Sequence, residues 1–310
     1  MRWFKTSPRY DIRGFAQSIK RDAIGAIHEV LVKHFITKFL GVTYGFKDCA
    51  SWVSLFRTLL RRQRFLLIVL DDARYDAFAR VYNRYLRGML IKARVPPPNT
   101  YGWLPRLFLY PEFNDVRVFY ASIGIESHDI RIKSFVPRDR EVEVIPIKPN
   151  RAKHLRTVLP SEVNEVVMDV GLSGRDIIWY AQPHFPWIVD EELSIMLMRD
   201  ALIHDYLPPD TIRQRLKAIG VPRSGLVKAY YANLMLVLCY VRELIHYAID
   251  QGVDYEEIVV TSDHGEMLGE LGLYLHQEYD LPQLTIVPWL KLVPRMYMEI
   301  LEYTSHLQKC

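Results

Sequence analysis

Short apolar runs recur along the chain, and two of them end abruptly in polar residues. Residues 65–70 contain no polar position, and residues 258–261 are all apolar or β-branched. Runs of this length without polar alternation are typical of parallel strands that are covered on both faces. We therefore expect two buried parallel strands at these places.

Further runs complete the pattern of an α/β protein. Residues 175–181 and 116–123 predict two more strands, and residues 141–146 a short one. Apolar residues at helical spacing predict a long helix over 226–250, which carries the chain to the strand at 258 as a right-handed crossover. This order of elements predicts a three-layer α/β/α sandwich with a mainly parallel central sheet.

The first sixty residues have a different character. Phe15, Ile19, Ala23 and Ile27 recur at helical spacing among basic residues, and a second helix is expected over 50–61. We take residues 1–60 as a helical N-terminal extension, which packs on its own core or on a twin subunit. The alternative is peripheral contact with an anionic membrane.

We expect residues 61–310 to form the main α/β domain. Near 190–225 this domain carries an insert with the turn Leu207-Pro-Pro-Asp210, which we expect to hold two short helices that form a lid.

The polar residues that follow the strands at 65–70 and 258–261 are candidates for a metal site. Asp71 and Asp72 follow one strand, and Asp263 and His264 follow the other. In open α/β sheets, ligands bind beyond the carboxyl ends of the strands, and carboxylate and imidazole groups are natural ligands of divalent cations. The alternative is that Asp71 caps a helix that starts near Ala73 while Asp72 is solvated.

Other polar residues lie near these ends. His184 follows the strand at 175–181 between two prolines, and it is either functional or bonded to a nearby carbonyl. Arg74 can bind a phosphate oxygen or pair with Asp76 or Asp72. Glu266 can accept a hydrogen bond from the His264 imidazole and so orient it as a metal ligand. His128 and Asp129 are reserve candidates for a second metal.

Five ordered segments resemble the alkaline phosphatase/sulfatase superfamily, in its sulfatase-like hydrolase and transferase branch. The segments are Leu67-Ile-Val-Leu-Asp-Asp-Ala-Arg-Tyr-Asp76, Asn99-Thr-Tyr-Gly-Trp-Leu-Pro105, Ile178-Trp-Tyr-Ala-Gln-Pro-His-Phe-Pro-Trp187, Thr261-Ser-Asp-His-Gly-Glu-Met-Leu-Gly-Glu270, and His276 followed by Val287-Pro-Trp289. The likeness covers roughly residues 65–292 and implies an alkaline-phosphatase-like fold.

The resemblance implies a nucleophile at Thr100. Sulfatases use a Cys or Ser in Cys/Ser-x-Pro-x-Arg, and neither Cys49, Cys239 nor Cys310 lies in that context. A threonine is the choice of phosphodiesterases, phosphonate hydrolases and phosphoglycerol or phosphoethanolamine transferases of the superfamily. Thr100 also reads as the N-cap of a helix over 101–109, and Thr157 or Ser122 are alternative nucleophiles.

The resemblance also implies the remaining roles. It makes residues 61–310 the catalytic domain. One or two divalent cations (Mn, Zn, Mg or Ca) are expected on Asp71, Asp263, His264, Thr100 and His276, with Asp72 as an additional ligand. His184 or His276 is expected as acid or base, His184 also binds the substrate, and Arg74 joins it there by its chemistry alone. The expected function is hydrolysis or transfer of phosphate esters, including glycan or lipid head groups. The alternatives are a sulfate-ester hydrolase without formylglycine and a catalytically silent binding homologue.

Composition narrows the setting. The chain has 310 residues, a net charge of +4, three cysteines and 50% hydrophobic residues. Three scattered cysteines and the short apolar runs predict a soluble, cytoplasmic protein, at most peripheral to a membrane, and an oligomer is compatible with this. The mild charge fits an anionic ester substrate, and no nucleic-acid-binding signature is present.

Overall fold

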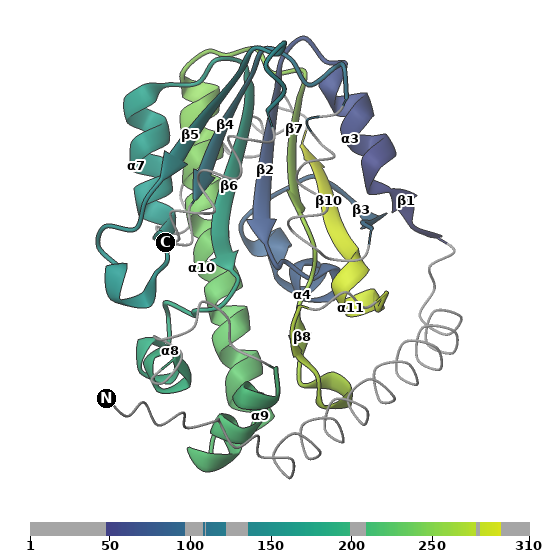
Figure 1. Cartoon of the computed structure of the whole chain (residues 1–310). Helices are drawn as coiled ribbons and strands as arrows, with labels where there is room; N and C mark the ends of the chain where they lie inside the picture. The colour runs from purple at the N-terminus through teal and green to yellow at the C-terminus, as the bar shows by residue number, and fades with distance from the viewer. Residues whose placement is uncertain are drawn as a thin grey trace, which may run out of the picture.

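The computed structural model describes residues 48–96, 108, 110–121, 136–198, 209–276 and 280–292. Its centre is one eight-stranded sheet (Figure 1). In spatial order, the strands are β1 (Ala50–Ser51), β3 (Met89–Arg94), β10 (Ile286–Leu292), β7 (Glu257–Ser262), β2 (Phe65–Asp71), β6 (Arg175–Pro183), β4 (Val116–Ala121) and β5 (Val142–Ile147).

The sheet is mostly parallel. Strands β7, β2, β6, β4 and β5 pair in parallel, and β10 runs antiparallel to both of its neighbours, β3 and β7. The strands expected from the apolar runs are present, whereas β3 was not predicted, because its sequence Met-Leu-Ile-Lys-Ala-Arg mixes apolar and basic residues.

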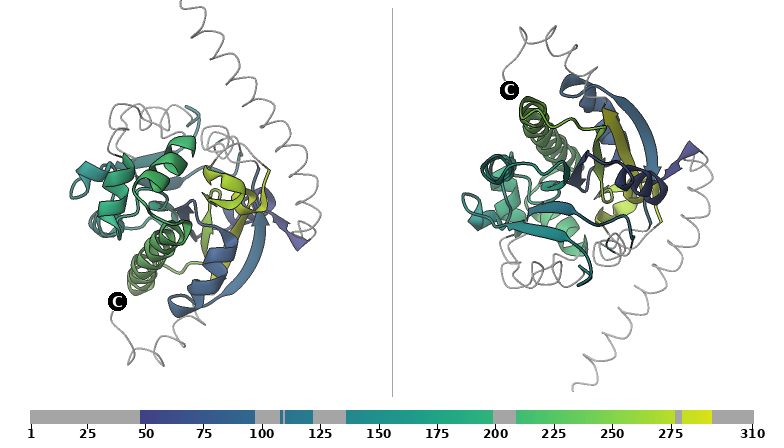
Figure 2. Two further views of the ribbon diagram at one scale, coloured as in Figure 1. Left: turned by 90° about the horizontal axis from the view of Figure 1, so that it is seen from below. Right: turned by 90° about the horizontal axis from the view of Figure 1, so that it is seen from above.

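Helices cover both faces of the sheet. The described helices are α3 (Trp52–Leu60), α4 (Tyr75–Val81), α7 (Pro160–Val170), α8 (Glu191–Met198), α9 (Pro209–Ala218), α10 (Arg223–Asp250) and α11 (Pro282–Thr285), of which α8 and α9 lie beyond the ends of the strands (Figure 1). Short 3-10 turns lie at Tyr82–Arg84, Lys153–Leu155 and Glu270–Gly272, and a hairpin joins β8 (Met267–Leu268) to β9 (Tyr274–Leu275). In the end-on views (Figure 2), α10 and α3 lie on opposite sides of the sheet.

The two-residue period of the strands builds both cores. In β2, Leu66 and Ile68 pack in one core with α4, α7 and α10, whereas Leu67 and Val69 pack in the other with α3. This explains why β2 has no polar position before Asp71. The three-layer α/β/α sandwich expected from the sequence is confirmed.

Helix α3 belongs to the last part of the expected N-terminal extension. Its residues Trp52, Phe56 and Leu59 are fully buried in the core, and the Trp52 indole N–H donates to Thr261 Oγ1 on β7 at 2.9 Å. The end of the expected extension therefore packs on the sheet. The expected helix before it lies outside the described residues.

Helix α10 is the only described helix that is long and apolar enough, by length and composition, to cross a membrane. Its side chains Leu226, Leu238 and Ala248 are nevertheless buried in the core beside the sheet. A core helix passes the same test of length and apolarity. The two short helices expected in the insert are α8 and α9, and their role as a lid stays a prediction.

Candidate metal centre

Three strands end at the same edge of the sheet and bring the expected site residues together. Asp72 follows β2, His184 follows β6, and Asp263 and His264 follow β7. The β8–β9 hairpin then folds back and places His276 beside them, with ring centroids 4.5 Å apart between His276 and His264. Residues from four separate sequence segments thus meet in one cluster.

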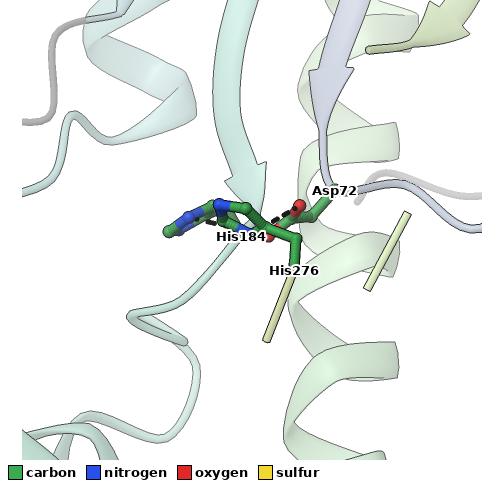
Figure 3. Close-up of side chains that lie close together, drawn as sticks. All are labelled: Asp72, His184 and His276. Carbon is green, nitrogen blue, oxygen red and sulfur yellow. Dashed lines mark ion pairs between the residues drawn. The ribbon is translucent and has the colours of Figure 1, made fainter. Parts of the chain in front are cut away.

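Asp72 is the centre of this cluster. Its Oδ1 lies 2.6 Å from His264 Nδ1 and 3.3 Å from His276 Nδ1, and its Oδ2 lies 3.6 Å from His184 Nε2. Figure 3 shows His184 and His276 converging on the carboxylate of Asp72 at the ends of β6 and β2. Asp72 is fully buried, and its backbone has φ 66°, a left-handed conformation that costs a non-glycine residue energy.

The carboxylate of Asp72 is poorly satisfied by the protein itself. Among the described residues, no donor reaches Oδ1 or Oδ2 of Asp72, Oδ2 of Asp263 or Nδ1 of His276 with hydrogen-bond geometry. Buried polar atoms without a partner are costly and rare in native proteins. Ligand atoms within 4.8 Å of one another, as those of Asp72, His184 and His276 are, form the arrangement that a bound cation satisfies.

Asp263 joins the two strand ends. Its Oδ1 accepts hydrogen bonds from the backbone N–H of Asp72 at 3.3 Å and of His264 at 2.8 Å, and its Oδ2 lies 3.3 Å from His264 Nε2. Asp71 is the last residue of β2, and α4 begins only at Tyr75. The alternative in which Asp71 caps that helix is therefore wrong.

Burial sets the protonation of the carboxyl groups. Desolvation, followed by the charges of Asp263 and Asp72, raises the pKa of Asp71 well above its usual range. Desolvation likewise raises the pKa of Asp263 and of Glu266. Desolvation also acts on Asp72, but His276, His184 and His264 outweigh it and hold the pKa of Asp72 well below its usual range. Asp72 is the acid that stays ionised.

Burial and neighbouring charges also shift the pKa values of the three imidazoles, and in different directions. Burial lowers the pKa of His264, but the charges of Asp263 and Asp72 overcome it and raise that pKa to about 9. The pKa of His276 is also raised against its burial, chiefly by Asp72, whereas burial dominates for His184 and lowers its pKa. Without a cation, the raised pKa values favour the protonated forms of these groups: Asp71, Asp263, Glu266, His264 and His276.

The donor set fits one or two divalent cations. Asp72, His184 and His276 offer ligand atoms within 4.8 Å of one another, and so do Asp71, Asp72 and His264. Asp72 belongs to both groups, although the sequence suggested it only as an additional ligand. Mixed carboxylate and imidazole ligands suit Zn²⁺ and Mn²⁺.

Arg74 lies beside the cluster with its guanidinium already engaged. It contacts both carboxylate oxygens of Asp76, at 2.8 and 2.7 Å, and Glu270 Oε1 at 2.8 Å, and it donates to the carbonyl of Glu266 at 3.2 Å. These contacts fit the alternative in which Arg74 holds the loop. A role in substrate binding stays a prediction.

Several candidates lie outside the described residues. They are the nucleophile Thr100 with the helix expected after it, the reserve ligands His128 and Asp129, and the alternative nucleophile Ser122. The other alternative, Thr157, is buried, and its Oγ1 accepts a hydrogen bond from Gln182 Nε2 at 3.2 Å.

Three buried residues that support the loops of the cluster carried no signal in the sequence. Ser262 Oγ lies 2.6 Å from the carbonyls of Leu70 and His264, and so joins β2 to the loop after β7. On α10, the Tyr230 hydroxyl donates to the carbonyl of Asp72, and the Asn233 side-chain amide donates to the carbonyl of His184. In the sequence, Tyr230 is only one of the apolar positions of a helix.

The comparisons with known proteins add solved structures only. No protein-family model and no curated protein sequence matches this chain. The periplasmic domain of a phosphoethanolamine transferase from Campylobacter jejuni is similar at 17% identity and a TM-score of 0.47, with 79% of this chain and 84% of that chain covered.

Two further structures are similar to the chain. The soluble domain of a lipooligosaccharide phosphoethanolamine transferase from Neisseria meningitidis has 16% identity and a TM-score of 0.43, with 79% of this chain and 82% of that chain covered. A phosphonate monoester hydrolase of Agrobacterium radiobacter has 13% identity and a TM-score of 0.45, with 76% and 68% covered.

Since the TM-scores are below 0.5, the fold assignment rests on the strand order and the layers described above. The cytoplasmic location expected from the sequence finds no support in the structure or in these similarities.

Proposed function

We propose that this chain is a divalent-metal-dependent enzyme that hydrolyses or transfers phosphate esters, with Thr100 as the nucleophile. The observation that carries the proposal is the Asp72 carboxylate. It is fully buried, three imidazole nitrogens lie 2.6, 3.3 and 3.6 Å from its oxygens, and none of these contacts has the geometry of a hydrogen bond among the described residues. A buried, ionised carboxylate surrounded by further ligand atoms is what a cation site requires.

In this proposal the cluster holds the cation. Asp71, Asp72, Asp263 and His264 are the ligands at the ends of β2 and β7, with Thr100 as a further ligand, and His276 joins Asp72 at the second group. A divalent cation supplies Lewis acidity, which favours the alkoxide form of an alcohol and offsets the charge of a phosphate oxygen.

The protein's own groups then carry the ester through two displacements. The Oγ of Thr100 forms a bond to phosphorus while the bond to the leaving oxygen breaks, and His184 or His276 gives that oxygen a proton. Water or an acceptor hydroxyl next forms a bond to phosphorus, gives its proton to the same histidine and frees the Thr100 oxygen. Water makes the enzyme a hydrolase, and a glycan or lipid hydroxyl makes it a transferase.

The experiment is turnover of para-nitrophenyl phosphate, its bis ester and its sulfate after chelation and re-addition of Mn²⁺, Zn²⁺, Mg²⁺ or Ca²⁺. We expect metal-restored cleavage of a phosphate ester that is lost in Thr100→Ala and Asp72→Asn but kept in Thr157→Ala. The sulfate tests the alternative of sulfate-ester hydrolysis.

Other outcomes would contradict parts of the proposal. Activity kept in Thr100→Ala and lost in Thr157→Ala would move the nucleophile to Thr157. Metal binding without turnover of any ester would leave a transferase that needs its own acceptor, or a silent binding homologue. Absence of metal binding would exclude the site as proposed.

A further inference from the structure

Helix α10 contacts the backbone of three loops that carry the candidate ligands. Near its start, Arg223 Nε donates to the carbonyl of Leu268 at 2.7 Å, and Arg223 also pairs with Glu270 at 2.9 Å, within the hairpin that leads to His276. Further along, Tyr230 and Asn233 contact the loops after β2 and β6. One helix thus touches the loops of His276, Asp72 and His184.

Tyr230 holds the turn that contains Asp72. Its hydroxyl donates to the carbonyl of Asp72 at 2.8 Å and accepts the N–H of Arg74 at 3.0 Å. Tyr230 is fully buried, so water cannot replace these bonds without entering the core. Because Asp72 adopts φ 66°, which is unfavourable for a side chain with a Cβ, the turn depends on contacts of this kind.

Asn233 holds the loop that contains His184 in a similar manner. Its Nδ2 donates to the carbonyls of Pro183 at 3.3 Å and His184 at 3.4 Å, and its Oδ1 accepts the N–H of Ile188 at 3.2 Å. Asn233 is fully buried and lies three residues after Tyr230, on the same face of α10. The two side chains therefore hydrogen-bond to the loops after β2 and β6 from the same helix.

We propose that Tyr230 and Asn233 are positioning residues of the metal centre, which fix the separation between Asp72 and His184. The proposal rests on the proposed function, since it assigns these residues a role toward the same cation. Metal ligands keep their geometry through hydrogen bonds behind them, and the loss of such support typically weakens metal affinity by about 10- to 100-fold. The support here acts on the backbone of the ligand residues.

The chain contains a matched pair of control residues. Tyr180 on β6 and Asn164 on α7 are also buried, Tyr180 donates to Asn164 Oδ1, and Asn164 Nδ2 donates to the carbonyl of Tyr240 on α10 at 3.0 Å. They have the same side chains and also connect α10 to its surroundings. Within the part of the chain that the structure describes, neither side chain hydrogen-bonds to a loop that carries a candidate ligand.

The test compares Tyr230→Phe and Asn233→Leu with Tyr180→Phe and Asn164→Leu. Thermal unfolding of the metal-free proteins first shows that each variant folds. Calorimetric titration with Zn²⁺ then gives the affinity, and we expect it to fall about tenfold or more in the first two variants and to stay within about twofold in the controls. Excess Zn²⁺ should restore esterase activity in Tyr230→Phe, and the visible spectrum of the Co²⁺-loaded variant should differ from that of the wild type.

A second measurement does not depend on a metal. Amide hydrogen exchange at Arg74 in the metal-free protein should accelerate at least about tenfold in Tyr230→Phe and stay unchanged in Tyr180→Phe. Unchanged exchange at Arg74 would overturn the role of Tyr230. If Tyr230→Phe does not fold, Asn233→Leu carries the affinity test.

The outcomes separate this proposal from the proposed function. If wild type binds Zn²⁺, Asp72→Asn does not, and both α10 variants bind as tightly as wild type, the positioning role is overturned and the metal centre stands. If wild type binds none of Zn²⁺, Mn²⁺, Mg²⁺ and Ca²⁺, the proposed function and the positioning role toward a metal both fail.

Discussion

The Nδ1 atom of His264 lies 2.6 Å from Oδ1 of Asp72, although the two residues follow different strands. The contact exists because β7 and β2 are parallel neighbours, with Leu70 paired to Ser262, so that their next residues emerge side by side. Both side chains are almost fully buried. The acid and the imidazole are buried together beside oxygens that lack hydrogen-bond partners. The stability of the cluster is therefore sensitive to any change in charge.

Asp72→Asn should abolish metal binding. Asp72 is shared by both ligand groups, and asparagine keeps only one neutral oxygen, while its amide nitrogen is a hydrogen-bond donor that cannot bind a cation. We expect the affinity for Zn²⁺, measured by calorimetric titration, to fall by about 100-fold or more. The matched control is Asp176→Asn, since Asp176 is also fully buried but lies at the opposite end of β6. Equal loss of Zn²⁺ binding in both variants would contradict the site.

The metal-free protein should lose stability as pH rises from about 5 to about 9. The pKa values of Asp71, Asp263 and Glu266 are raised by burial above their ordinary values of 3.8 and 4.5, so the folded state binds more protons than the unfolded state. The free energy of unfolding then falls as pH rises. His264, with a pKa raised from 6.5 to about 9, extends the same trend above pH 6.5.

This pH dependence has a clear control. Urea unfolding with a chelator should show the decline, Asp71→Asn should make it shallower, and saturating Zn²⁺ should remove it, because the cation replaces the protons. His184, whose pKa is lowered by burial, acts in the opposite sense below pH 6.5. If the metal-free protein instead gained stability across this range, the pKa values of these carboxyl groups would not be raised in the folded state.

Gly265→Ala should displace the loop that carries His264. A Cβ on Gly265 would lie 2.0 Å from the carbonyl oxygen of Gln283, a backbone atom that cannot simply rotate away. We expect a loss of about 1–3 kcal/mol in the free energy of unfolding, together with weaker Zn²⁺ binding. In the control Gly225→Ala, the new Cβ would lie 3.1 Å from a side-chain carbon of Val221, and Zn²⁺ binding should be unchanged.

Arg74→Lys separates the two roles considered for this residue. A lysine has one nitrogen, so it cannot contact both oxygens of Asp76 and reach Glu270 as well. If Arg74 has a structural role, the free energy of unfolding should therefore fall by about 1–3 kcal/mol. This loss is smaller than that for a fully buried ion pair, because the Asp76 side chain is half exposed. The KM for the ester should then change little. A large rise in KM with unchanged stability would instead indicate that Arg74 binds the substrate. Arg151→Lys, in an exposed pair with Glu165, is the control.

Much of the fold followed from local patterns. The apolar runs of β2 and β7 identify buried parallel strands because residues on both faces must leave water, and their ends place Asp71, Asp72, Asp263 and His264 at one edge of the sheet. Strand β3 and the β8–β9 hairpin were not predicted, since their short or mixed sequences gain their structure from neighbours.

The sequence by itself determined most of the strands and helices along the chain and the kinds of side chain at the strand ends, because hydrophobic periodicity and residue chemistry are local properties. Only the tertiary structure decided that Asp72 lies at the centre of the cluster, that Arg74 is engaged by Asp76 and Glu270, and that Tyr230 and Asn233 support the loops. These relationships depend on the register and packing of distant segments. A buried tyrosine that packs in a core and one that also holds a ligand loop have the same pattern in the sequence.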